Sequence, residues 1–344
     1  MAPSTQSDAA PLRGPLRVRL IGKANGVGLS RDLELLAGAL RACGCSVTVR
    51  GCEKRDRKRR RNVLTRLNAR WYELRRRLVG PPAAAYDINL MLEHVWPQFL
   101  HEAASNVLVP NPEWFDRRDL AFLGAASRVW AKTAHAERIF TARGSAATRI
   151  GFDSEDRWDG AVARQPHFLH LAGRSPLKGT QRLHALWLRH PQWPMLTIVQ
   201  DGVALREASN LKACRGYLDD AALRTLQNAH RFHICTSEAE GWGHYIAEAM
   251  SVGAITLTCD AAPMNELVTA ERGMLVAAQE GEPHNLARLI RFDEAALEAA
   301  VVRALGMSDA QCEAMGSAAR GWFLDNKQGF VGRVCRAVAE IASP

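Results

Sequence analysis

Two glutamates, Glu240 and Glu248, stand eight positions apart in the stretch TSEAEGWGHYIAEAM, where Gly241 and Gly243 flank a tryptophan. The preceding RFHIC is typical of a short buried strand and HYIAEAMSVG of a helix, so the glycines lie in a strand-to-helix turn. A helix start offers free N–H groups and the positive end of the helix dipole to an anion, and glycines let that anion reach the backbone. Carboxylates beside such a site are suited to accepting hydrogen bonds from hydroxyls. The stretch therefore predicts a ligand that carries both phosphates and sugars.

Two cations belong to a similar turn earlier in the sequence. Arg174 and Lys178 follow a strand-like run in HLAGRSPLKGTQRLHALW, one just after the strand and one at the start of a helix. Both charges and the helix dipole can therefore converge on one anion, above all on a diphosphate. Simpler alternatives need no ligand: the cations would be solvated, Glu240 would complement a helix dipole, and Glu248 would be an exposed helix glutamate.

The rest of the sequence supplies the elements that must position these residues. Hydrophobic runs alternate with helical patterns almost throughout, which predicts parallel sheets covered by helices. Strand-like runs in the first half are LRVRLI, SVTVR, YDINLML, NVLVP, RVWA and ATRI, and those in the second half are HFLHLA, MLTIV, FHIC, AITLTC and GMLV. We therefore expect an α/β protein with two facing Rossmann-like domains.

The expected domain boundaries follow from the same pattern. GFDSEDRWDGAVARQP is polar and without periodicity, as is typical of a linker, and it separates the two sets of strands. We expect a flexible tail over residues 1–15, an N-terminal Rossmann-like domain over 16–155 with a basic insertion at 50–80, and a second Rossmann-like domain over 166–325. The pattern turns helical after about residue 285, and 326–344 would form a terminal helix that packs back toward the N-terminal domain.

Composition favours a cytoplasmic protein. The chain has 344 residues, 47% of them hydrophobic, and no apolar run long enough to span a bilayer. The first fifteen residues lack the apolar region of an export signal. Eight cysteines without CxxC spacing predict neither a disulfide framework nor a zinc ribbon, and a reducing compartment fits them. The histidine pairs at 167/170 and 230/233 fall in strand-like runs, so we expect structural histidines and no metal site.

The net charge of +9 comes from one segment. Residues 50–80 hold thirteen Lys and Arg against three acidic residues, and the remaining residues are nearly balanced. A generally basic face is therefore missing, and we expect no nucleic-acid partner. Within the segment, an apolar stripe recurs at helical spacing: Leu64, Leu67, Trp71, Leu74 and Leu78. Residues 54–78 would contact an anionic membrane surface or an acidic acceptor, or the stripe would pack on the protein itself.

The stretch from about 166 to 276 resembles the retaining glycosyltransferases of the GT-B fold, family 4 type. It carries AGRSPLKG, CRGYLDDAALRTLQNAHRF, TSEAEGWGHYIAEAMSVGAITLT and APMNELV in the family's order and approximate spacing. The family's two glutamates, with seven residues between them, match Glu240 and Glu248. The resemblance implies that Glu248 binds the ribose hydroxyls of the donor. It also implies that the donor sugar and a nearby phosphate are held by Glu240 and the amides of Gly241, Trp242 and Gly243.

Further donor residues follow from the same resemblance. Arg174 and Lys178 match the pair that neutralises the donor diphosphate. The loop that frames the nucleotide base is matched by RGYL, that is by Arg215, Gly216, Tyr217 and Leu218. The 166–325 domain would thus bind the nucleotide sugar, and the 16–155 domain would face the acceptor.

The N-terminal half departs more from the family. Its glycine-rich loop is matched loosely by Gly26 and Gly28 in GKANGVGLSRDLELLAGAL, which is not a dinucleotide fingerprint and could equally serve a tight turn. His94 in INLMLEHVWP matches the family's histidine after a middle strand and is the candidate acceptor-side catalytic residue. A core or capping histidine is the alternative, and Glu93 beside it competes for the inward position.

The activity implied by this resemblance is transfer of a sugar, hexosyltransferase-like, from a nucleoside-diphosphate sugar to an acceptor hydroxyl. The anomeric configuration would be retained, with neither metal nor cofactor, in the synthesis of a glycan, glycolipid or glycoconjugate. The catalytic residues would be His94, Arg174, Lys178 and Glu240. We expect a cytoplasmic enzyme that associates peripherally with the inner face of the membrane. The alternatives are an epimerase or hydrolase of nucleotide sugars on the same fold, and a protein that binds a nucleotide sugar without catalysis.

Overall fold

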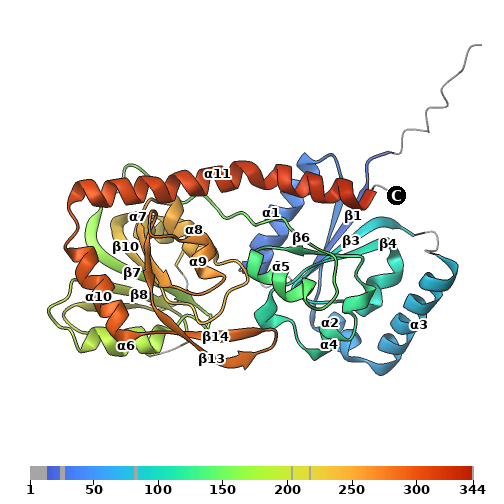
Figure 1. Ribbon diagram of the computed structural model, residues 1–344, viewed down its shortest axis with the longest axis horizontal. Helices are drawn as coiled ribbons and strands as arrows, with labels where there is room; N and C mark the ends of the chain where they lie inside the picture. The colour runs from blue at the N-terminus through green and yellow to red at the C-terminus, as the bar shows by residue number, and fades with distance from the viewer. Residues whose placement is uncertain (1–13, 24–27, 81–83, 203, 217, 343–344) are drawn as a thin grey trace, which may run out of the picture.

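Two six-stranded parallel sheets form the framework of the protein (Figure 1). The computed structural model describes residues 14–23, 28–80, 84–202, 204–216 and 218–342. The first sheet has the order β2-β1-β3-β4-β5-β6, and the second β12-β11-β10-β7-β8-β9. The strands of the first sheet are β1 (Arg17–Gly22), β2 (Ser46–Gly51), β3 (Tyr86–Leu92), β4 (Ala103–Val109), β5 (Arg128–Ala131) and β6 (Ala147–Arg149).

The second sheet begins after the predicted linker. Its strands are β7 (Gln165–Gly173), β8 (Leu196–Gln200), β9 (Leu211–Cys214), β10 (His230–Cys235), β11 (Ile255–Cys259) and β12 (Met274–Val276). A separate antiparallel pair, β13 (Ala278–His284) and β14 (Ala287–Phe292), follows it. Every run that the sequence predicts as a strand forms one, and the expectation of two Rossmann-like sheets is confirmed.

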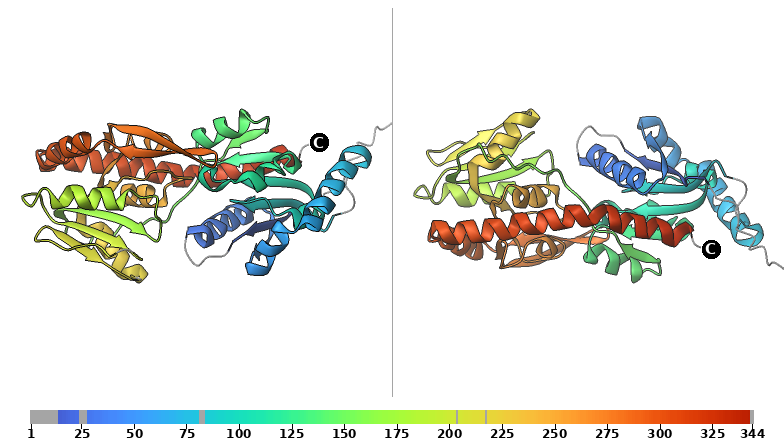
Figure 2. Two further views of the ribbon diagram at one scale, coloured as in Figure 1. Left: turned by 90° about the horizontal axis from the view of Figure 1, so that it is seen from below. Right: turned by 90° about the horizontal axis from the view of Figure 1, so that it is seen from above.

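Helices cover both faces of each sheet, so the inner strands are apolar runs buried on both sides (Figure 2). The helices of the first half are α1 (Gly28–Ala42), α2 (Lys54–Arg61), α3 (Val63–Val79), α4 (Arg117–Leu120) and α5 (Ala134–Thr141), with 3-10 turns η1 (Pro97–Glu102), η2 (Pro112–Trp114) and η3 (Leu123–Ala125). Those of the second half are α6 (Thr180–Leu188), α7 (Asp220–Ala229), α8 (His244–Ser251), α9 (Met264–Leu267), α10 (Glu294–Leu305) and α11 (Asp309–Ala342).

The order of strands fixes where a ligand can bind. In the first sheet β1 lies between β2 and β3, and in the second β7 lies between β8 and β10. The chain therefore reverses its direction of winding beside β1 and beside β7, and open parallel sheets bind ligands at the carboxyl ends of the strands at such a point. The turns that hold Lys178 and Glu240 follow β7 and β10, and His94 follows β3.

Three strands lie outside the predicted ones. Strand β9 is a short edge strand whose sequence LKAC lacks a clear apolar pattern. The hairpin β13–β14 begins at Ala278, and its second strand lies in the region beyond residue 285 where the sequence predicts helices. Its first strand, AQEGEPH, is charged and contains a proline, because an exposed two-stranded ribbon needs little apolar surface.

The terminal helix is longer than predicted. Helix α11 has 34 residues and begins at Asp309, not near residue 326, and Figure 1 shows it running along both halves of the molecule. Its last turns reach the first half, where Glu340 lies 3.3 Å from Arg128 and Arg333 donates to the carbonyl of Ile150. One disulfide, Cys43–Cys335, joins it to the residue directly after α1. The sequence expectation did not include this bond, and the cysteines therefore no longer argue for a reducing compartment.

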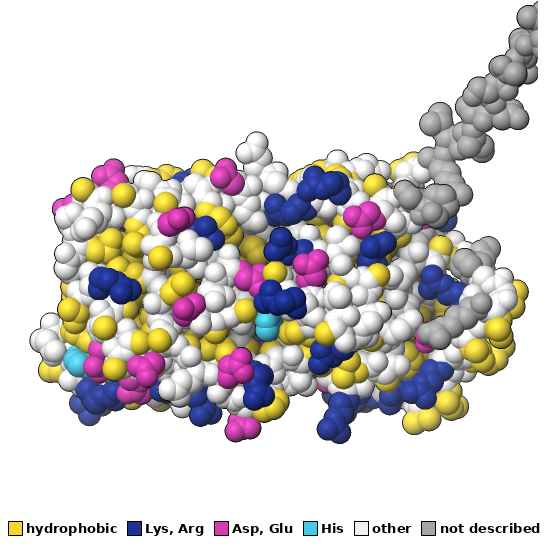
Figure 3. Space-filling view, viewed as in Figure 1, with side chains coloured by type: hydrophobic (Ala, Val, Ile, Leu, Met, Phe, Trp, Pro, Cys, Tyr) yellow, Lys and Arg dark blue, Asp and Glu magenta, His cyan; other side chains and the backbone are white. Residues whose placement is uncertain are grey.

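The basic insertion folds as α2 and α3 at one corner of the first half. Figure 3 shows Lys and Arg side chains beside hydrophobic ones at this corner of the surface. Leucines and a tryptophan on α3 are among the most exposed large apolar side chains of the described residues. The alternative in which the apolar stripe packs on the protein itself is therefore wrong.

Candidate functional site

The turn between β10 and α8 has the backbone that its glycines predict. Gly243 has a φ of 95° and caps α8 in the left-handed region, which glycine adopts without strain. Gly241 faces the first half of the molecule: a Cβ there would lie 2.2 Å from Oδ1 of Asn111. Any side chain at position 241 would thus collide with the residue that follows β4.

The turns after β7 and β10 are joined to each other. The hydroxyl of Thr236 donates to the carbonyl of Lys178 over 3.1 Å. Gly179, which caps α6 with a φ of 68°, has no room for a side chain because a Cβ would lie 2.6 Å from the carbonyl oxygen of Thr236. The two helix starts, at α6 and α8, are therefore held side by side at one edge of the sheet.

Lys178 and Glu240 meet between these turns. Their side chains form an ion pair, and Glu240 also accepts a hydrogen bond from Ser237. The ammonium of Lys178 lies 3.9 Å from the centre of the Tyr245 ring, a cation–π contact that holds it over α8. The structure thus brings together two of the residues that the sequence places in the donor site.

Arg174 does not join this pair. Its side chain is exposed, and its guanidinium lies 3.1 Å from the carboxylate of Asp201. Convergence of both cations on one point, as the sequence predicts, is therefore absent from this structure. Arg174 would have to turn away from Asp201 to reach a ligand held by Lys178.

Glu248 is buried, so the alternative of an exposed helix glutamate is wrong. One carboxylate oxygen forms an ion pair with Arg31 of helix α1, and the other accepts a hydrogen bond of 3.0 Å from Gln227. Arg31 also lies 3.4 Å from Glu155. Arg31, a residue of the first half, is thus paired with the carboxylate that the sequence predicts to bind the ribose.

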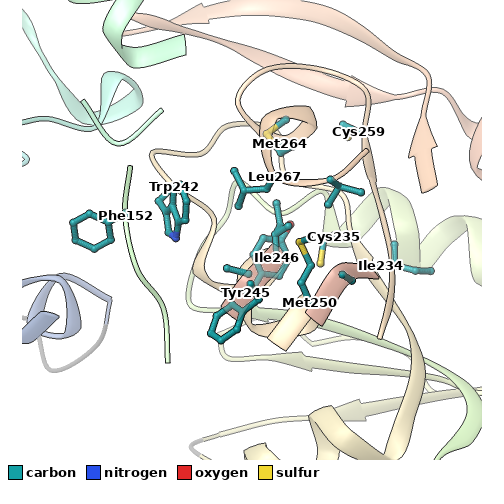
Figure 4. Close-up of a cluster of buried hydrophobic side chains, with 14 of the residues drawn as sticks. Phe152, Ile234, Cys235, Trp242, Tyr245, Ile246, Met250, Cys259, Met264 and Leu267 are labelled. Atoms are coloured by element: carbon teal, nitrogen blue, oxygen red, sulfur yellow. The ribbon is translucent and has the colours of Figure 1, made fainter. Parts of the chain in front are cut away.

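Helix α8 owes its position to a packed apolar core. Figure 4 shows Ile246 and Met250 of α8 among Ile234 and Cys235 of β10 and Met264 of α9. This core fixes the side chains that α8 presents to the turn.

The side chain of Trp242 contacts the segment that joins the two halves. Its indole N–H donates to the hydroxyl of Ser154 over 3.1 Å, and its ring meets Phe152 edge to face. Only its backbone amide is therefore a candidate to contact a donor.

A hydrogen-bonded chain connects the start of α8 to α1. Nε2 of His244 lies 2.6 Å from the carboxylate of Asp32, and its Nδ1 lies 2.9 Å from the hydroxyl of Ser154. Lys132 binds the second oxygen of Asp32. Burial alone would raise the pKa of Asp32, but the charges of Lys132 and His244 and their hydrogen bonds outweigh it and hold that pKa below its usual range. The two halves are thus tied together by buried ionic contacts beside the turn.

His94 lies on the acceptor side in a polar cluster of its own. Nδ1 donates to the buried carboxylate of Asp119 over 2.9 Å, and Nε2 lies 3.4 Å from Glu93. Arg60 of α2 pairs with the same Asp119 and lies 3.4 Å from His94. Glu93 has a φ of 63°, unusual for a residue with a side chain, and burial raises its pKa. An aspartate that holds Nδ1 leaves Nε2 available to accept a proton.

Two buried polar atoms near the donor turn have no hydrogen-bond partner among the described residues: Oδ1 of Asn111 and Oε2 of Glu113. The pKa of Glu113 is raised to about 8, mainly by burial; a backbone hydrogen bond opposes this shift and the charge of Glu240 adds to it. Sequence reasoning missed both residues. Their one signal is their position directly after a buried strand, in the same way as His94.

The remaining candidates are placed less directly. Arg215 and Leu218 follow the edge strand β9, and Arg215 donates to the carbonyl of Leu205 over 3.1 Å. Gly28 is the first residue of α1, which carries Arg31 toward Glu248. Gly26 and Tyr217 lie outside the described residues.

The histidines predicted to be structural are largely in the core. His170 donates to the carbonyl of Ile234 over 2.8 Å and lies 2.9 Å from the hydroxyl of Thr180. Burial lowers its pKa to about 4 and that of His233 to about 3. Within the described ranges, no three His, Cys, Asp or Glu side chains are grouped so as to hold a metal ion. Nor does that part of the chain contain a helix long and apolar enough to cross a membrane.

Comparison with known sequences finds neither a matching family model nor a matching curated protein. Comparison with solved structures finds many. A glycosyltransferase from Rickettsia africae superposes with a TM-score of 0.67 at 13% identity, over 96% of this chain and 100% of its own. Sucrose-phosphate synthase from Thermosynechococcus elongatus gives 0.67 at 13% identity, over 95% and 99% of the two chains. HepE of Anabaena, solved with UDP and glucose, gives 0.63 at 17% identity, over 95% and 99%.

These likenesses extend over nearly the whole length of both chains in each pair. The chain therefore has the GT-B fold of glycosyltransferases, with its two sheets in the arrangement that the sequence predicts. At this level of identity the likeness concerns the fold, and membership of family 4 remains a prediction.

Proposed function

We propose that this protein transfers a sugar from a nucleoside-diphosphate sugar to a hydroxyl of an acceptor, with retention of the anomeric configuration. The observation that carries the proposal is the meeting of Lys178 and Glu240 at the carboxyl ends of β7 and β10, with Glu248 in the second turn of α8. A cation, two carboxylates and two helix starts at the reversal point of a parallel sheet suit a ligand with phosphates and hydroxyls. The neighbouring structures solved with UDP support the same choice.

Donor binding would exchange ion pairs within the site. The diphosphate would take the place of Glu240 beside Lys178 and accept hydrogen bonds from the N–H groups at the starts of α6 and α8. Glu240, released from Lys178, would turn to the hydroxyls of the sugar. Glu248 would exchange Arg31 for the ribose hydroxyls, since a buried carboxylate needs a new hydrogen-bond donor for the one it loses. Arg174 would add its charge from the rim.

The bond that breaks joins the anomeric carbon to the terminal phosphate oxygen, and the bond that forms joins that carbon to the acceptor oxygen. Negative charge grows on the departing diphosphate, and Lys178 with the two helix dipoles stabilises it without a metal ion. Retention would follow from attack on the face that the diphosphate leaves. The acceptor proton then passes to a phosphate oxygen. A glycoside-hydrolase mechanism fits less well, because Glu240 lies beside the phosphate-binding cation.

His94 would act on the acceptor side. Its Nδ1 is held by Asp119, which orients the ring and favours the tautomer whose Nε2 can accept a hydrogen bond from an acceptor hydroxyl. Glu93, whose pKa is raised by burial, would contribute a second polar group to this subsite. The acceptor itself would be a hydroxyl-bearing component of a glycan, glycolipid or glycoconjugate.

The roles of the two glutamates separate in a binding experiment. Glu248→Ala should weaken the free nucleoside diphosphate and the nucleotide sugar alike, whereas Glu240→Ala should weaken only the nucleotide sugar. UDP, GDP, ADP and dTDP and their sugars would be titrated calorimetrically, with Glu313→Ala, an exposed glutamate of α11, as the matched control. Equal losses of affinity for both ligands in both variants would contradict these two roles. Unchanged affinities in both variants would show that the donor does not bind at this site.

A further inference from the structure

Helix α3 turns its apolar side away from the protein. Leu64 is 69% exposed, Trp71 63% and Leu78 76%, and Leu67 and Leu74 between them are also exposed. Of the large apolar side chains exposed on the described residues, about half lie in the short segment from 49 to 79. A helix that serves only the core of its own domain would bury such a stripe.

The geometry of the helix shows that this exposure is systematic. At about 100° per residue, the five side chains Leu64, Leu67, Trp71, Leu74 and Leu78 fall within an arc of about 80°. Ala69, only 5% exposed, lies about 180° from the middle of that arc and marks the side that packs on the domain. The apolar arc therefore faces directly outward.

Cations border this arc on both sides. Arg70 and Arg75 are exposed and lie at its two edges by the same helical angles. Helix α2, directly before α3, adds six exposed cations: Lys54, Arg55, Arg57, Lys58, Arg59 and Arg61. An outward apolar arc flanked by cations is the pattern of a helix that lies in the plane of a bilayer interface, with apolar side chains among the acyl chains and cations at the head groups.

We propose that α2 and α3 dock the protein on an anionic membrane surface, with the Leu64–Leu78 arc inserted into the interface. Charge complementarity selects this occupant: anionic head groups would meet the cations while the acyl chains cover the leucines and Trp71. A second copy of this chain would place its own cations against those of the first copy, and like charges repel. A nucleic acid would satisfy the cations and leave the leucines in water.

One arginine of α2 points the other way and links the docking helices to the acceptor side. Arg60 is buried, donates to the carbonyl of Val95 over 3.0 Å and pairs with Asp119, the carboxylate that also holds His94. Asp119 thus links Arg60 of the docking helices to the acceptor-side histidine. If the protein is a transferase as proposed above, docking would bring its acceptor side to the membrane surface, whereas the docking itself is independent of the transfer.

The test is sedimentation of the full chain with vesicles of phosphatidylcholine alone or containing phosphatidylglycerol. The wild type should bind only the anionic vesicles, and should lose at least tenfold in bound fraction when the salt concentration is raised tenfold. Leu67→Asn with Leu74→Asn, which leaves the charge unchanged, should reduce binding at least tenfold. Val302→Asn, a matched exposed site on α10, should leave it unchanged.

A second variant tests the charges, and a spectroscopic readout tests insertion. Arg57→Gln, Arg59→Gln and Arg61→Gln together should reduce binding similarly, with Arg60 left in place because it is buried. Bromine-labelled lipids should quench tryptophan fluorescence in the wild type and less in Trp71→Phe. Circular dichroism of each variant checks that it is folded.

Three outcomes would overturn the proposal. The first is absence of binding to anionic vesicles at low salt. The second is binding that the leucine variant leaves unchanged, which would identify purely electrostatic adsorption on the cations without insertion of the arc. The third is a dimer in the absence of vesicles that the leucine variant dissociates, which would identify a second copy as the occupant. None of these measurements involves a sugar donor, so failure here leaves the proposed transferase activity untouched.

Discussion

At the scale of single residues, the charges of the proposed donor site neutralise one another before any ligand arrives. Lys178 pairs with Glu240, and Arg31 pairs with Glu248. Lys178→Ala should weaken binding of a nucleoside diphosphate by roughly 2 to 4 kcal/mol, because the cation that faces the diphosphate is lost. Binding of the corresponding nucleoside should change little. Calorimetric titration of both ligands checks this, with the exposed Lys212→Ala as control, and equal losses for both ligands would refute the diphosphate contact.

The buried carboxyl of Glu113 predicts a pH dependence of stability. Its pKa is raised to about 8 from 4.5, so the protonated form is favoured in the folded state. Its contribution to stability is therefore full below about pH 4.5 and is lost as the pH rises toward 8. Glu113→Gln is neutral at every pH. Its free energy of unfolding should therefore rise relative to that of the wild type across this window, by at most about 1.4 kcal/mol per pH unit. Urea unfolding at pH 5, 6, 7 and 8 measures the difference; a constant difference would contradict the raised pKa.

The sequence identifies some of these residues and misses others for a physical reason. Lys178, Glu240 and His94 each follow a recognisable strand, so their common location at strand ends can be predicted. Arg31 and Glu113 reach the site through contacts between the two halves of the chain. Contacts between elements far apart in sequence leave no local pattern, so spacing alone does not reveal them.

At the scale of elements, helices α8 and α11 cross at two glycines. A Cβ on Gly316 of α11 would lie 2.4 Å from the carbonyl oxygen of Gly253, just after α8. Gly316→Ala should therefore separate the helices and destabilise the protein by about 1 to 3 kcal/mol. Gly321→Ala, on the same helix with no atom within 4 Å of the added carbon, should stabilise it by about 0.4 to 1 kcal/mol. Thermal and urea unfolding of both variants measure the two changes in stability. Changes of the same sign would contradict the close contact at Gly316.

The sequence predicts too short a terminal helix because the local apolar pattern is weak before residue 326. Gly316 and Gly321 lower helix propensity there, as Gly329 and Gly332 do further on, so propensity alone does not show where the helix begins. Packing against α8 and β11 in the second half and against α1 in the first half stabilises the helix along its length. The hairpin β13–β14 is missed for a related reason, because exposed, charged strands carry no apolar alternation.

At the scale of the whole molecule, the disulfide Cys43–Cys335 closes the chain on itself. It joins the residue directly after α1 to α11 across 292 residues of sequence. Cys43→Ser with Cys335→Ser should lower the free energy of unfolding by about 2 to 5 kcal/mol, because the unfolded chain regains its freedom. A reductant should lower the melting temperature of the wild type and leave that of the double variant unchanged. Titration of eight free thiols in protein never exposed to reductant would show that the bond does not form.

The overall architecture is the level that the sequence predicts best. Alternating strand and helix patterns suffice for two Rossmann-like sheets, because each buried parallel strand is a continuous apolar run. How the halves face each other depends on buried pairs such as Asp32 with His244, which only the folded chain brings together. The domain boundaries at 155, 166 and 325 stay predictions.

Product analysis shows whether the chain moves a sugar from a nucleotide to an acceptor hydroxyl. The labelled sugar donor whose nucleotide binds in calorimetry would be incubated with the protein and with mixtures of soluble glycans and of anionic lipid extracts. We expect labelled sugar on an acceptor hydroxyl with the donor's anomeric configuration, nucleoside diphosphate released in equal amount, and loss of both in Lys178→Ala. Donor consumed at the same rate without acceptor, an inverted product, or a bound donor that is never consumed would contradict the proposed transfer.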